Sequence, residues 1–491
     1  MQTLEKLKNI SEFCSERQTT GLSFSALSEF IEKDPDLVRA IDEAWVKHQQ
    51  LRQSYPEFLQ LPEHIQISQA QSGYVNFYEP WSVNPYMALA ARGPWIISMK
   101  GAVIHDSGGY GMLGFGHGPE QILEAMNQNH VMANIMTANL AQKTFSDAIK
   151  KEIGHSRPSG ERQPYHRIIC MNSGSEAVSV ASRLSDIHAS FQMKSFARGK
   201  QIRFMSLKGS FHGRTDRPSQ FSDSSLPKYR QHLKSFQERN NLLTITPNDC
   251  QELSDTFKRC QHENIWIEAM LIEPVMGEGD PGKAVTPEFY QLARELTKKH
   301  HSLLIVDSIQ AGLRAHGCLS MMDYPGFQDL EAPDMETFSK ALNAGQYPLS
   351  VLAMNQRTAE LYVTGVYGNT MTTNPRALSV ACAVLDMVTP QLRQNIQERG
   401  REFLRIFSDI KAEFPSLITK IQGTGLLFSM ELASDRVSVN GHDGLEMRLR
   451  KKGLGVIHGG TNSLRFTPHF RITSQEAHLI ADILREELRS L

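Results

Sequence analysis

SLLIVDSIQAG, residues 302–312, is an apolar run that ends in an aspartate. Five similar apolar runs alternate with longer amphipathic segments between residues 168 and 354: 168–171, 202–207, 243–246, 269–273 and 349–354. This alternation predicts an α/β fold with a largely parallel sheet covered by helices on both faces. Ligands of such sheets bind beyond the carboxyl ends of the strands, so the residues after each run are the candidates for chemistry.

The composition is that of an ordinary globular protein. Of the 491 residues, 40% are hydrophobic and 21% are charged, and the net charge at pH 7 is −1. A balance so close to zero produces no field that attracts phosphate backbones or anionic lipids, so we expect neither nucleic acid nor membrane as a partner. Chains of this length rarely form a single core, and a large domain with a smaller one attached is expected.

The cysteines and the N-terminus indicate the compartment. None of the six cysteines forms a CxxC pair, which disfavours a zinc site and a disulfide framework, so no metal is expected. The first ten residues lack the apolar core of a signal peptide, and no stretch of about 18 uncharged apolar residues occurs. We therefore expect a reduced, cytoplasmic chain.

Changes in composition predict four parts. Residues 1–75 are charged, with apolar positions at helical spacing, and are predicted to form an N-terminal helical extension. Residues 76–118 are rich in glycine, proline and aromatics and are predicted to be the N-terminal part of a small domain. Residues 119–375 are predicted to form the large domain, and residues 376–491 the interdomain helices and the C-terminal small domain.

NSGSEA, residues 172–177, follows the first run and begins a helical pattern. Ser173 and Glu176 have the spacing of a capping box, in which each side chain accepts a backbone N–H of the other residue. The remaining free N–H groups of such a helix start would also suit a phosphate. A plain helix cap and an anion site are both compatible with these residues.

KGSFHGRT, residues 208–215, follows the second run and places three ligand-binding side-chain types among glycines. The aromatic ring of Phe211, the imidazole of His212 and the guanidinium of Arg214 would suit a flat, anionic ligand. The alternative is a purely structural role, in which Phe211 is a core residue.

MGEGDPG, residues 276–282, formally contains the GxGxxG of a dinucleotide site, and the next run ends in an acidic residue as such a site requires. Glu278 and Asp280, however, would place two carboxylates in the pyrophosphate cradle, and Pro281 removes a backbone donor. A nicotinamide-dependent dehydrogenase is therefore disfavoured.

Asp307 and Lys340 complete the candidate site. A carboxylate at the buried end of an apolar strand needs a cationic partner, such as a protonated pyridine nitrogen, unless it merely caps a helix. Lys340 stands among small residues, where partial desolvation would favour Schiff-base chemistry, although a lone lysine is usually a surface residue. A phosphate cup, a stacking ring, an aspartate for a ring nitrogen and a lysine for an aldehyde are together what pyridoxal phosphate needs.

The motifs resemble those of the class-III (ω-amino-acid) aminotransferases over roughly residues 85–490. Six of them occur in the family's order and approximate spacing: NSGSEA (172–177), FHGRT (211–215), EPVMGEG (273–279), DSIQAG (307–312), SKAL (339–342) and NTMTTNP (369–375). The resemblance implies fold type I of the pyridoxal-phosphate enzymes. In that fold a large domain carries a mostly parallel seven-stranded sheet, and a smaller α/β domain is built from the C-terminal and N-terminal segments.

The resemblance also implies which residues hold the cofactor. Lys340 looks like the lysine that forms the Schiff base and then shuttles the proton, and Asp307 looks like the partner of the pyridine nitrogen. The other cofactor-binding residues that it implies are Gly174 and Ser175 in the phosphate cup, Phe211 stacked on the ring, Gln310 near the phenolic oxygen, and His212 and Glu273 in the neighbouring motifs. Thr370 is similar to the threonine that reaches the phosphate in the neighbouring subunit, which implies a homodimer with shared active sites.

Four residues concern the substrates. Arg465 resembles the arginine that binds the α-carboxylate of glutamate, and Glu278 matches the glutamate that neutralises this arginine while an ω-amino donor is bound. Arg214 resembles an arginine for a distal carboxylate, and Tyr110 resembles a substrate-facing tyrosine. The implied reaction is a ping-pong transamination through pyridoxamine phosphate. An amino acid or ω-amine donor (lysine-, ornithine-, diaminobutyrate- or 4-aminobutyrate-like) would pass its amine to 2-oxoglutarate.

Two positions depart from the family pattern: Ser308 stands where the family usually has Glu after the Asp, and Met276 stands where it usually has Gln. Because Asp307 is retained, activation of the cofactor is expected to survive. An aminomutase, racemase or decarboxylase of the same class would share the cofactor residues. A non-enzymatic protein on this fold is a further alternative, since fold does not decide function.

Overall fold

The structure is a computed structural model that describes residues 3–14, 16–158 and 163–491. The chain divides into two compact units. Unit 1 comprises the chain up to residue 120 together with residues 398–422 and 428–491, and unit 2 comprises residues 121–397 and 423–427.

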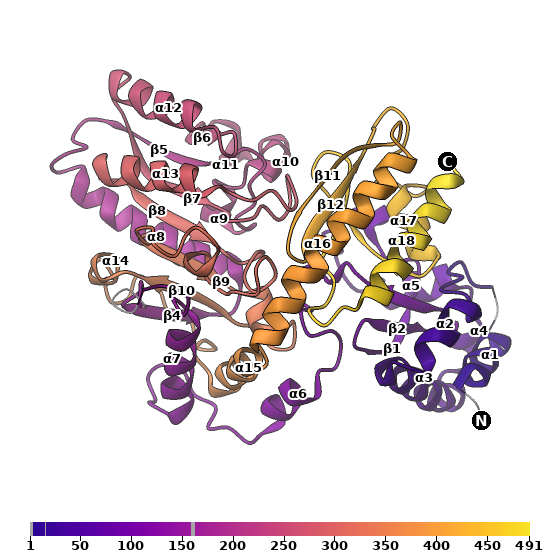
Figure 1. Cartoon of the computed structure of the whole chain (residues 1–491). Coiled ribbons are helices and arrows are strands. Elements are labelled where there is room, and N and C mark those ends of the chain that lie inside the picture. Colours follow the sequence, from indigo (N-terminus) through magenta and orange to yellow (C-terminus); the bar gives the residue numbers. More distant parts are fainter. Residues whose placement is uncertain (1–2, 15, 159–162) are drawn as a thin grey trace. The chain divides into compact units, whose positions relative to one another are not determined.

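Unit 2 is built on a seven-stranded sheet with the strand order β4-β10-β9-β8-β7-β5-β6 (Figure 1). Its strands are β4 (Arg167–Met171), β5 (Gln201–Leu207), β6 (Leu242–Ile245), β7 (Ile265–Ile272), β8 (Leu303–Asp307), β9 (Met335–Phe338) and β10 (Ser350–Met354). The pairs from β6 through β9 are parallel, whereas β10 is antiparallel to both neighbours. The predicted α/β fold with a mostly parallel seven-stranded sheet is confirmed.

The direction of β10 follows from the short segment that precedes it. A parallel connection needs a crossover of about a dozen residues or more, usually with a helix that packs on the sheet. Only residues 339–349 separate β9 from β10, and they contain one short 3-10 helix, η5 (Lys340–Asn343). The chain therefore turns back and pairs antiparallel.

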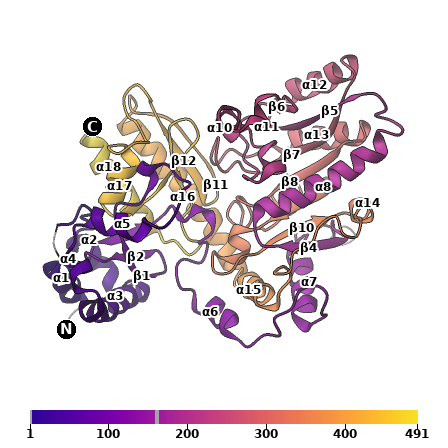
Figure 2. The same ribbon diagram turned by 180° about the vertical axis from the view of Figure 1, so that it is seen from behind.

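Helices cover both faces of this sheet, as the alternation of side chains along its strands requires. Met270 and Ile272 of β7 share one core with helices α12 (Cys250–His262) and α13 (Pro287–Lys299). Ala269 and Leu271 share a second core with α8 (Gly174–Gln192), which lies along the sheet in the view from behind (Figure 2).

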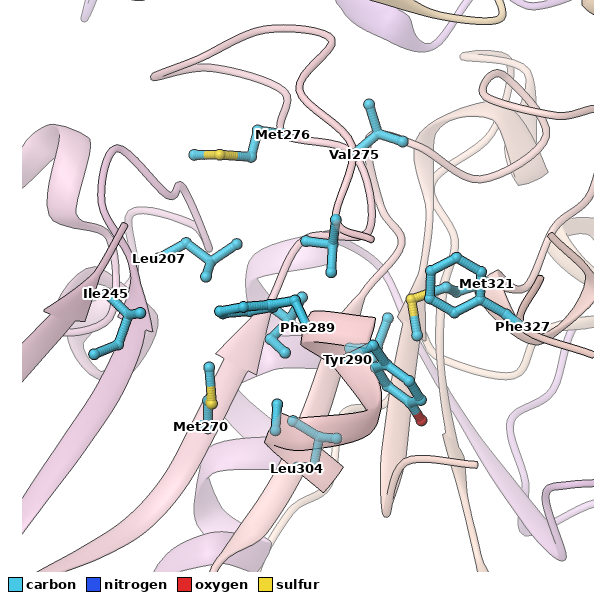
Figure 3. Close-up of a cluster of buried hydrophobic side chains, with 14 of the residues drawn as sticks. Leu207, Ile245, Met270, Val275, Met276, Phe289, Tyr290, Leu304, Met321 and Phe327 are labelled. Carbon is cyan, nitrogen blue, oxygen red and sulfur yellow. The ribbon is translucent and has the colours of Figure 1, made fainter. Parts of the chain in front are cut away.

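The core around α13 explains one departure from the family pattern. Phe289 and Tyr290 of α13 pack there against Met270 and other sheet residues (Figure 3). Met276 is completely buried in the same cluster. Its side chain therefore packs in the core and does not line the candidate site.

Several helices of unit 2 begin at side chains that accept exposed backbone N–H groups. At the start of α8, Ser173 and Glu176 form the predicted capping box, which is confirmed. Asp249 caps α12, and Thr286 caps α13, whose first residue is Pro287. The remaining α-helices between residues 120 and 413 are α6 (Glu120–Asn127), α7 (Leu140–Glu152), α9 (Asp216–Ser219), α10 (Leu226–His232), α11 (Lys234–Gln237), α14 (Gln356–Glu360), α15 (Pro375–Asp386) and α16 (Pro390–Glu413).

Unit 1 contains two four-stranded sheets, ordered β1-β2-β3-β13 and β11-β12-β15-β14. Their strands are β1 (Ala88–Arg92), β2 (Trp95–Ser98), β3 (Val103–Asp106), β11 (Ile418–Thr424), β12 (Leu427–Leu432), β13 (Leu454–Gly455), β14 (Ile457–Gly459) and β15 (Ser463–Phe466). Its helices are α1 (Thr3–Phe13), α2 (Phe24–Ile31), α3 (Pro35–Ser54), α4 (Pro56–Gln60), α5 (Glu63–Gln71), α17 (Leu445–Lys451) and α18 (Ser474–Arg489). The N-terminal helices pack on the first sheet, for example through Ile41 of α3 against Trp95 of β2. Within the described ranges, no helix is both long enough and apolar enough to span a bilayer.

Candidate active site

Asp307 is the last residue of β8 and is almost completely buried. Its Oδ2 lies 2.8 Å from Nδ1 of His212, and its Oδ1 accepts hydrogen bonds from Oγ1 of Thr337 (3.1 Å) and the backbone N–H of Ile309 (3.2 Å). A carboxylate oxygen has two lone pairs, so Oδ2 retains the capacity to accept one further donor. The cost of burying this carboxylate is thus offset by nearby donors, as the sequence predicted it had to be.

His212 is the ring that faces Asp307, and it follows β5 in the loop that carries the FHGRT motif. Because an ionised carboxylate can only accept, the Nδ1 of His212 carries the proton in this pair. Its Nε2 is buried and has no hydrogen-bond partner among the described residues. Buried polar atoms of this kind are uncommon in native folds and indicate a missing partner, such as a ligand or an ordered water.

Lys340 follows β9 and is half-buried, with its backbone in the left-handed region (φ 43°). Such a conformation is strained for a residue other than glycine, and strain of this kind concentrates at functional sites. Its amine contacts the Oε1 of Gln310, three residues after Asp307. The Nε2 of the buried Gln310 has no hydrogen-bond partner within the described chain. Lys340, Gln310 and Asp307 are thereby brought to one edge of the sheet.

The predicted phosphate cup lies at the N-terminus of α8. Gly174 and Ser175 occupy its first two positions, where helix geometry leaves the backbone N–H groups without intrahelical acceptors. The Oγ of Ser175 accepts the backbone N–H of Arg214 at 3.3 Å. Gly213 has a φ of 114°, and a Cβ there would lie 2.4 Å from the Oγ of Ser175, so only glycine allows this loop to approach the helix start.

Glu273 connects the loops after β5 and β7. Its carboxylate accepts the backbone N–H groups of Phe211 and Gly277, each at 3.1 Å. Complete burial raises the pKa of Glu273 to about 7; the charge of His212 opposes this shift and that of Asp307 adds to it. Glu273 therefore joins two loops of the site while itself titrating near neutrality.

The raised pKa of Glu273 predicts a pH-dependent stability. The folded state holds this proton more tightly than the unfolded chain, so the contribution of Glu273 to stability is complete below pH 4.5 and is lost as the pH rises through about 7. Relative to the Glu273→Gln variant, the free energy of unfolding of the wild type is expected to fall by about 3 kcal/mol across this window. Urea unfolding at a series of pH values without added cofactor measures it. A difference in the free energy of unfolding between the two proteins that stays constant with pH would refute the raised pKa of Glu273.

Two of the predicted substrate residues lie together in unit 2. The guanidinium of Arg214 is 3.8 Å from Oε1 of Glu278 and lies over the ring of Phe211, 5.3 Å from its centroid. Both charged side chains are partly exposed. The pairing that the resemblance implied for Glu278 was with Arg465, whereas the contact present within unit 2 is with Arg214.

The other two predicted substrate residues belong to unit 1. Arg465 is buried on β15, opposite Ser429 and Ile457 in the neighbouring strands. Tyr110 has a left-handed backbone (φ 47°) and stacks on Tyr78 with 5.9 Å between the ring centroids. Burial raises the pKa of the Tyr110 hydroxyl, which therefore stays protonated at neutral pH.

Thr370 lies at the surface of unit 2. Its carbonyl accepts the side-chain amide of Asn134 at 3.3 Å, and the adjacent Asn369 donates to Glu176 in the first turn of α8 at 3.2 Å. Thr370 also lines a cavity of about 760 Å³ beside the edge strand β4. The sequence motif thus lies close to the start of α8, on an exposed surface.

Sequence reasoning missed a second group of polar side chains behind the site. Thr337 donates to Asp307, and its neighbour Glu336 accepts hydrogen bonds from Ser308, Ser320 and Tyr165. The available signal was the pair of adjacent polar residues in the short segment 335–338, METF. Both are completely buried in this central strand, where polar side chains need hydrogen-bond partners.

These residues suit pyridoxal phosphate. The side-chain amide of Gln310 and the helix start at Gly174 supply donors, and the carboxylate of Asp307 supplies an acceptor, for a flat, phosphorylated, nitrogen-containing ring. The Nε2 atoms of His212 and Gln310 are both buried without a hydrogen-bond partner among the described residues. Phe211 is the aromatic side chain available to stack on that ring, and Lys340 is the amine available to its aldehyde.

Comparison with known proteins gives a consistent result. The chain matches the family described as aminotransferase class-III over residues 77–488. An acetylornithine aminotransferase of Mesorhizobium japonicum is 26% identical over 422 residues, which cover 84% of this chain and 96% of that protein. An ornithine aminotransferase of Staphylococcus carnosus is 27% identical over 395 residues, which cover 80% of this chain and 91% of that protein.

Solved structures show the same fold. The crystal structure of the ornithine aminotransferase from Toxoplasma gondii ME49 has a TM-score of 0.73 and 21% identity, and the match covers 89% of this chain and 98% of that chain. A second structure of the Toxoplasma gondii enzyme, with 22% identity and a TM-score of 0.73, is described with partial occupancy of pyridoxal phosphate at its active site. Since the family match spans most of its length, this chain belongs to the class-III aminotransferases and is a pyridoxal-phosphate-dependent enzyme.

Proposed function

We propose that this aminotransferase moves an amino group from an amino acid or ω-amine donor to 2-oxoglutarate in a ping-pong reaction. The donors that fit are those with the chemistry of ornithine, lysine, diaminobutyrate or 4-aminobutyrate. The observation that carries the proposal is the contact between the Lys340 amine and the side chain of Gln310. Gln310 lies on the loop that begins at the buried Asp307. The relatives named as ornithine and acetylornithine aminotransferases support a donor of this class.

Each residue in this proposal has a distinct task. Pyridoxal phosphate supplies an aldehyde for exchange with amines and a ring that accepts electrons. Lys340 takes the proton from the carbon that carries the donor's amine and later returns one, while the Oε1 of Gln310 orients its amine. Asp307 holds positive charge at the ring nitrogen, with His212 fixing its Oδ2. The N-terminus of α8 binds the phosphate.

Substrate carboxylates would be bound by arginines, because each guanidinium can form two parallel hydrogen bonds with one carboxylate. From its motif, we assign Arg465 to the α-carboxylate of a substrate. From its own motif, we assign Arg214 to a distal carboxylate. Glu278 neutralises Arg214 when a donor without a distal carboxylate is bound, since the two side chains are 3.8 Å apart and partly exposed. Tyr110 would face the donor chain.

A homodimer completes the proposal. Exposed apolar side chains occur in two segments of unit 2: Val131, Met132, Ile135 and Met136 in the first, and Val363 and Met371 in the second. Ile135 and Met136 also line the cavity beside β4, together with Tyr367 and Thr370. Exposed apolar side chains that lie together are a common mark of a protein interface. We assign it to a second copy of the chain, because Thr370 of the shared-site motif lies in the same surface. Light scattering at micromolar concentration tests the dimer.

The reaction is tested by a half-reaction spectrum. Single amino donors are mixed with the cofactor-loaded protein, and the visible absorption band of the bound cofactor is followed. We expect a donor of the proposed class to bleach the band and 2-oxoglutarate to restore it. A band that no donor bleaches would contradict transamination and favour a mutase, racemase or decarboxylase.

A further inference from the structure

Ser308 directly follows Asp307 and is almost completely buried. Its Oγ donates a hydrogen bond to Oε1 of Glu336 at 2.5 Å. Ser308 is also one of the two positions at which the chain departs from the family pattern, which has an acidic residue there. A carboxylate is thus present beside the Asp307 loop, although it comes from the neighbouring strand β9.

Glu336 is completely buried and accepts four hydrogen bonds. Besides Ser308, its Oε1 accepts the backbone N–H of Met321 (2.9 Å), and its Oε2 accepts the hydroxyls of Ser320 (2.6 Å) and Tyr165 (2.6 Å). A buried carboxylate is costly unless its lone pairs are satisfied, and four donors satisfy this one. Its position in the strand is therefore held from several sides.

Two links connect Glu336 to Asp307. In the parallel pairing of β8 with β9, Glu336 lies opposite Val306 and Thr337 lies opposite Asp307. Thr337 donates its hydroxyl to Oδ1 of Asp307 at 3.1 Å, and its carbonyl accepts the backbone N–H of Ser308 at 3.0 Å. The Ser308–Glu336 hydrogen bond is a second link between the two strands, because it joins the residue after Asp307 to the residue before Thr337.

We propose that Glu336 is a positioning residue: through Ser308 and Thr337 it holds the carboxyl end of β8 so that the Asp307 carboxylate keeps the orientation needed at the cofactor's ring nitrogen. This inference rests on the proposed role of Asp307. It assigns to a residue of β9 the acidic group that the family pattern places directly after the aspartate.

Two single-hydroxyl deletions test the proposal. Ser308→Ala removes the hydrogen bond that links Glu336 to the Asp307 loop. Tyr165→Phe removes a hydroxyl that donates to the other oxygen of the same carboxylate, Oε2, and that makes no hydrogen bond to the Asp307 loop. Both variants remove one buried donor, and we expect both to lower the unfolding temperature by similar amounts.

Only Ser308→Ala is expected to affect the cofactor. Its dissociation constant for pyridoxal phosphate should rise about tenfold, the scale of one hydrogen bond to a charged group, and the pH at which the visible band titrates should shift. Tyr165→Phe should leave the dissociation constant within about twofold of wild type. Thr337→Val removes the direct donor to Asp307 with little change in shape. It should also raise the dissociation constant for pyridoxal phosphate, as Ser308→Ala does.

The outcomes separate this inference from the proposed function. Equal dissociation constants for Ser308→Ala and Tyr165→Phe would overturn it and leave Glu336 a purely structural residue. A wild-type protein that binds pyridoxal phosphate without a visible band would instead overturn the assignment of Lys340, while the comparison of the dissociation constants would still decide the role of Glu336.

Discussion

The Lys340→Ala variant is expected to lose transamination almost completely. The substitution removes both the amine that holds the cofactor's aldehyde and the group that moves the proton, and proton transfer by a positioned side chain alone is worth about 10²–10⁴ in rate. We expect kcat for the best donor to fall by at least about a thousandfold. The fold should persist, because the Lys340 side chain is only half-buried and its removal costs few packing contacts.

Two controls accompany this variant. Lys298→Ala removes a lysine that pairs with Glu331 at the surface of α13 and should leave the rate unchanged. Lys340→Arg keeps the charge but has no amine able to condense with an aldehyde, and its loss should match that of Lys340→Ala. Full turnover by Lys340→Ala, measured with the same cofactor loading, would remove Lys340 from the mechanism.

The Asp307→Asn variant is expected to show the second-largest effect. Asparagine keeps the shape but loses the charge at the ring nitrogen, and its amide places N–H donors toward His212 or Thr337, which already donate to this position. Removing one preorganised electrostatic contact of an active site costs about 10²–10³ in kcat. We expect a loss of that size, together with weaker binding of pyridoxal phosphate, measured by equilibrium dialysis.

Asp323→Asn provides the matched control for this experiment. Asp323 is another buried aspartate, and it accepts the backbone N–H groups of Gly154 and Ser156. Its replacement should lower stability without a comparable loss of kcat. If both variants lost activity equally, the effect of Asp307→Asn would reflect folding and its proposed role would be wrong.

Local patterns predicted much of the fold. The apolar runs correspond to strands of the seven-stranded sheet, as 303–307 does to β8 and 202–207 to most of β5. The spacing of Ser173 and Glu176 predicted the capping box at the start of α8. Such features depend on residues within a few positions of one another, and hydrophobic periodicity or a single hydrogen bond is enough to specify them.

The partners of the charged groups came only from the tertiary structure. His212 faces Asp307 across 95 residues of sequence, and Ser308 reaches Glu336 on the adjacent strand. Glu278 meets Arg214, a partner that its motif did not indicate. Each of these contacts depends on which strands are neighbours and on the register between them.

For this protein, then, the order of strands, helices and motifs along the chain was sufficient to indicate a pyridoxal-phosphate enzyme of class III. That order could not predict which groups donate hydrogen bonds to its buried carboxylates. A buried charge is stable only where several donors converge on it, and in this fold the donors come from loops and strands distant in sequence. Their convergence exists only after the sheet has formed.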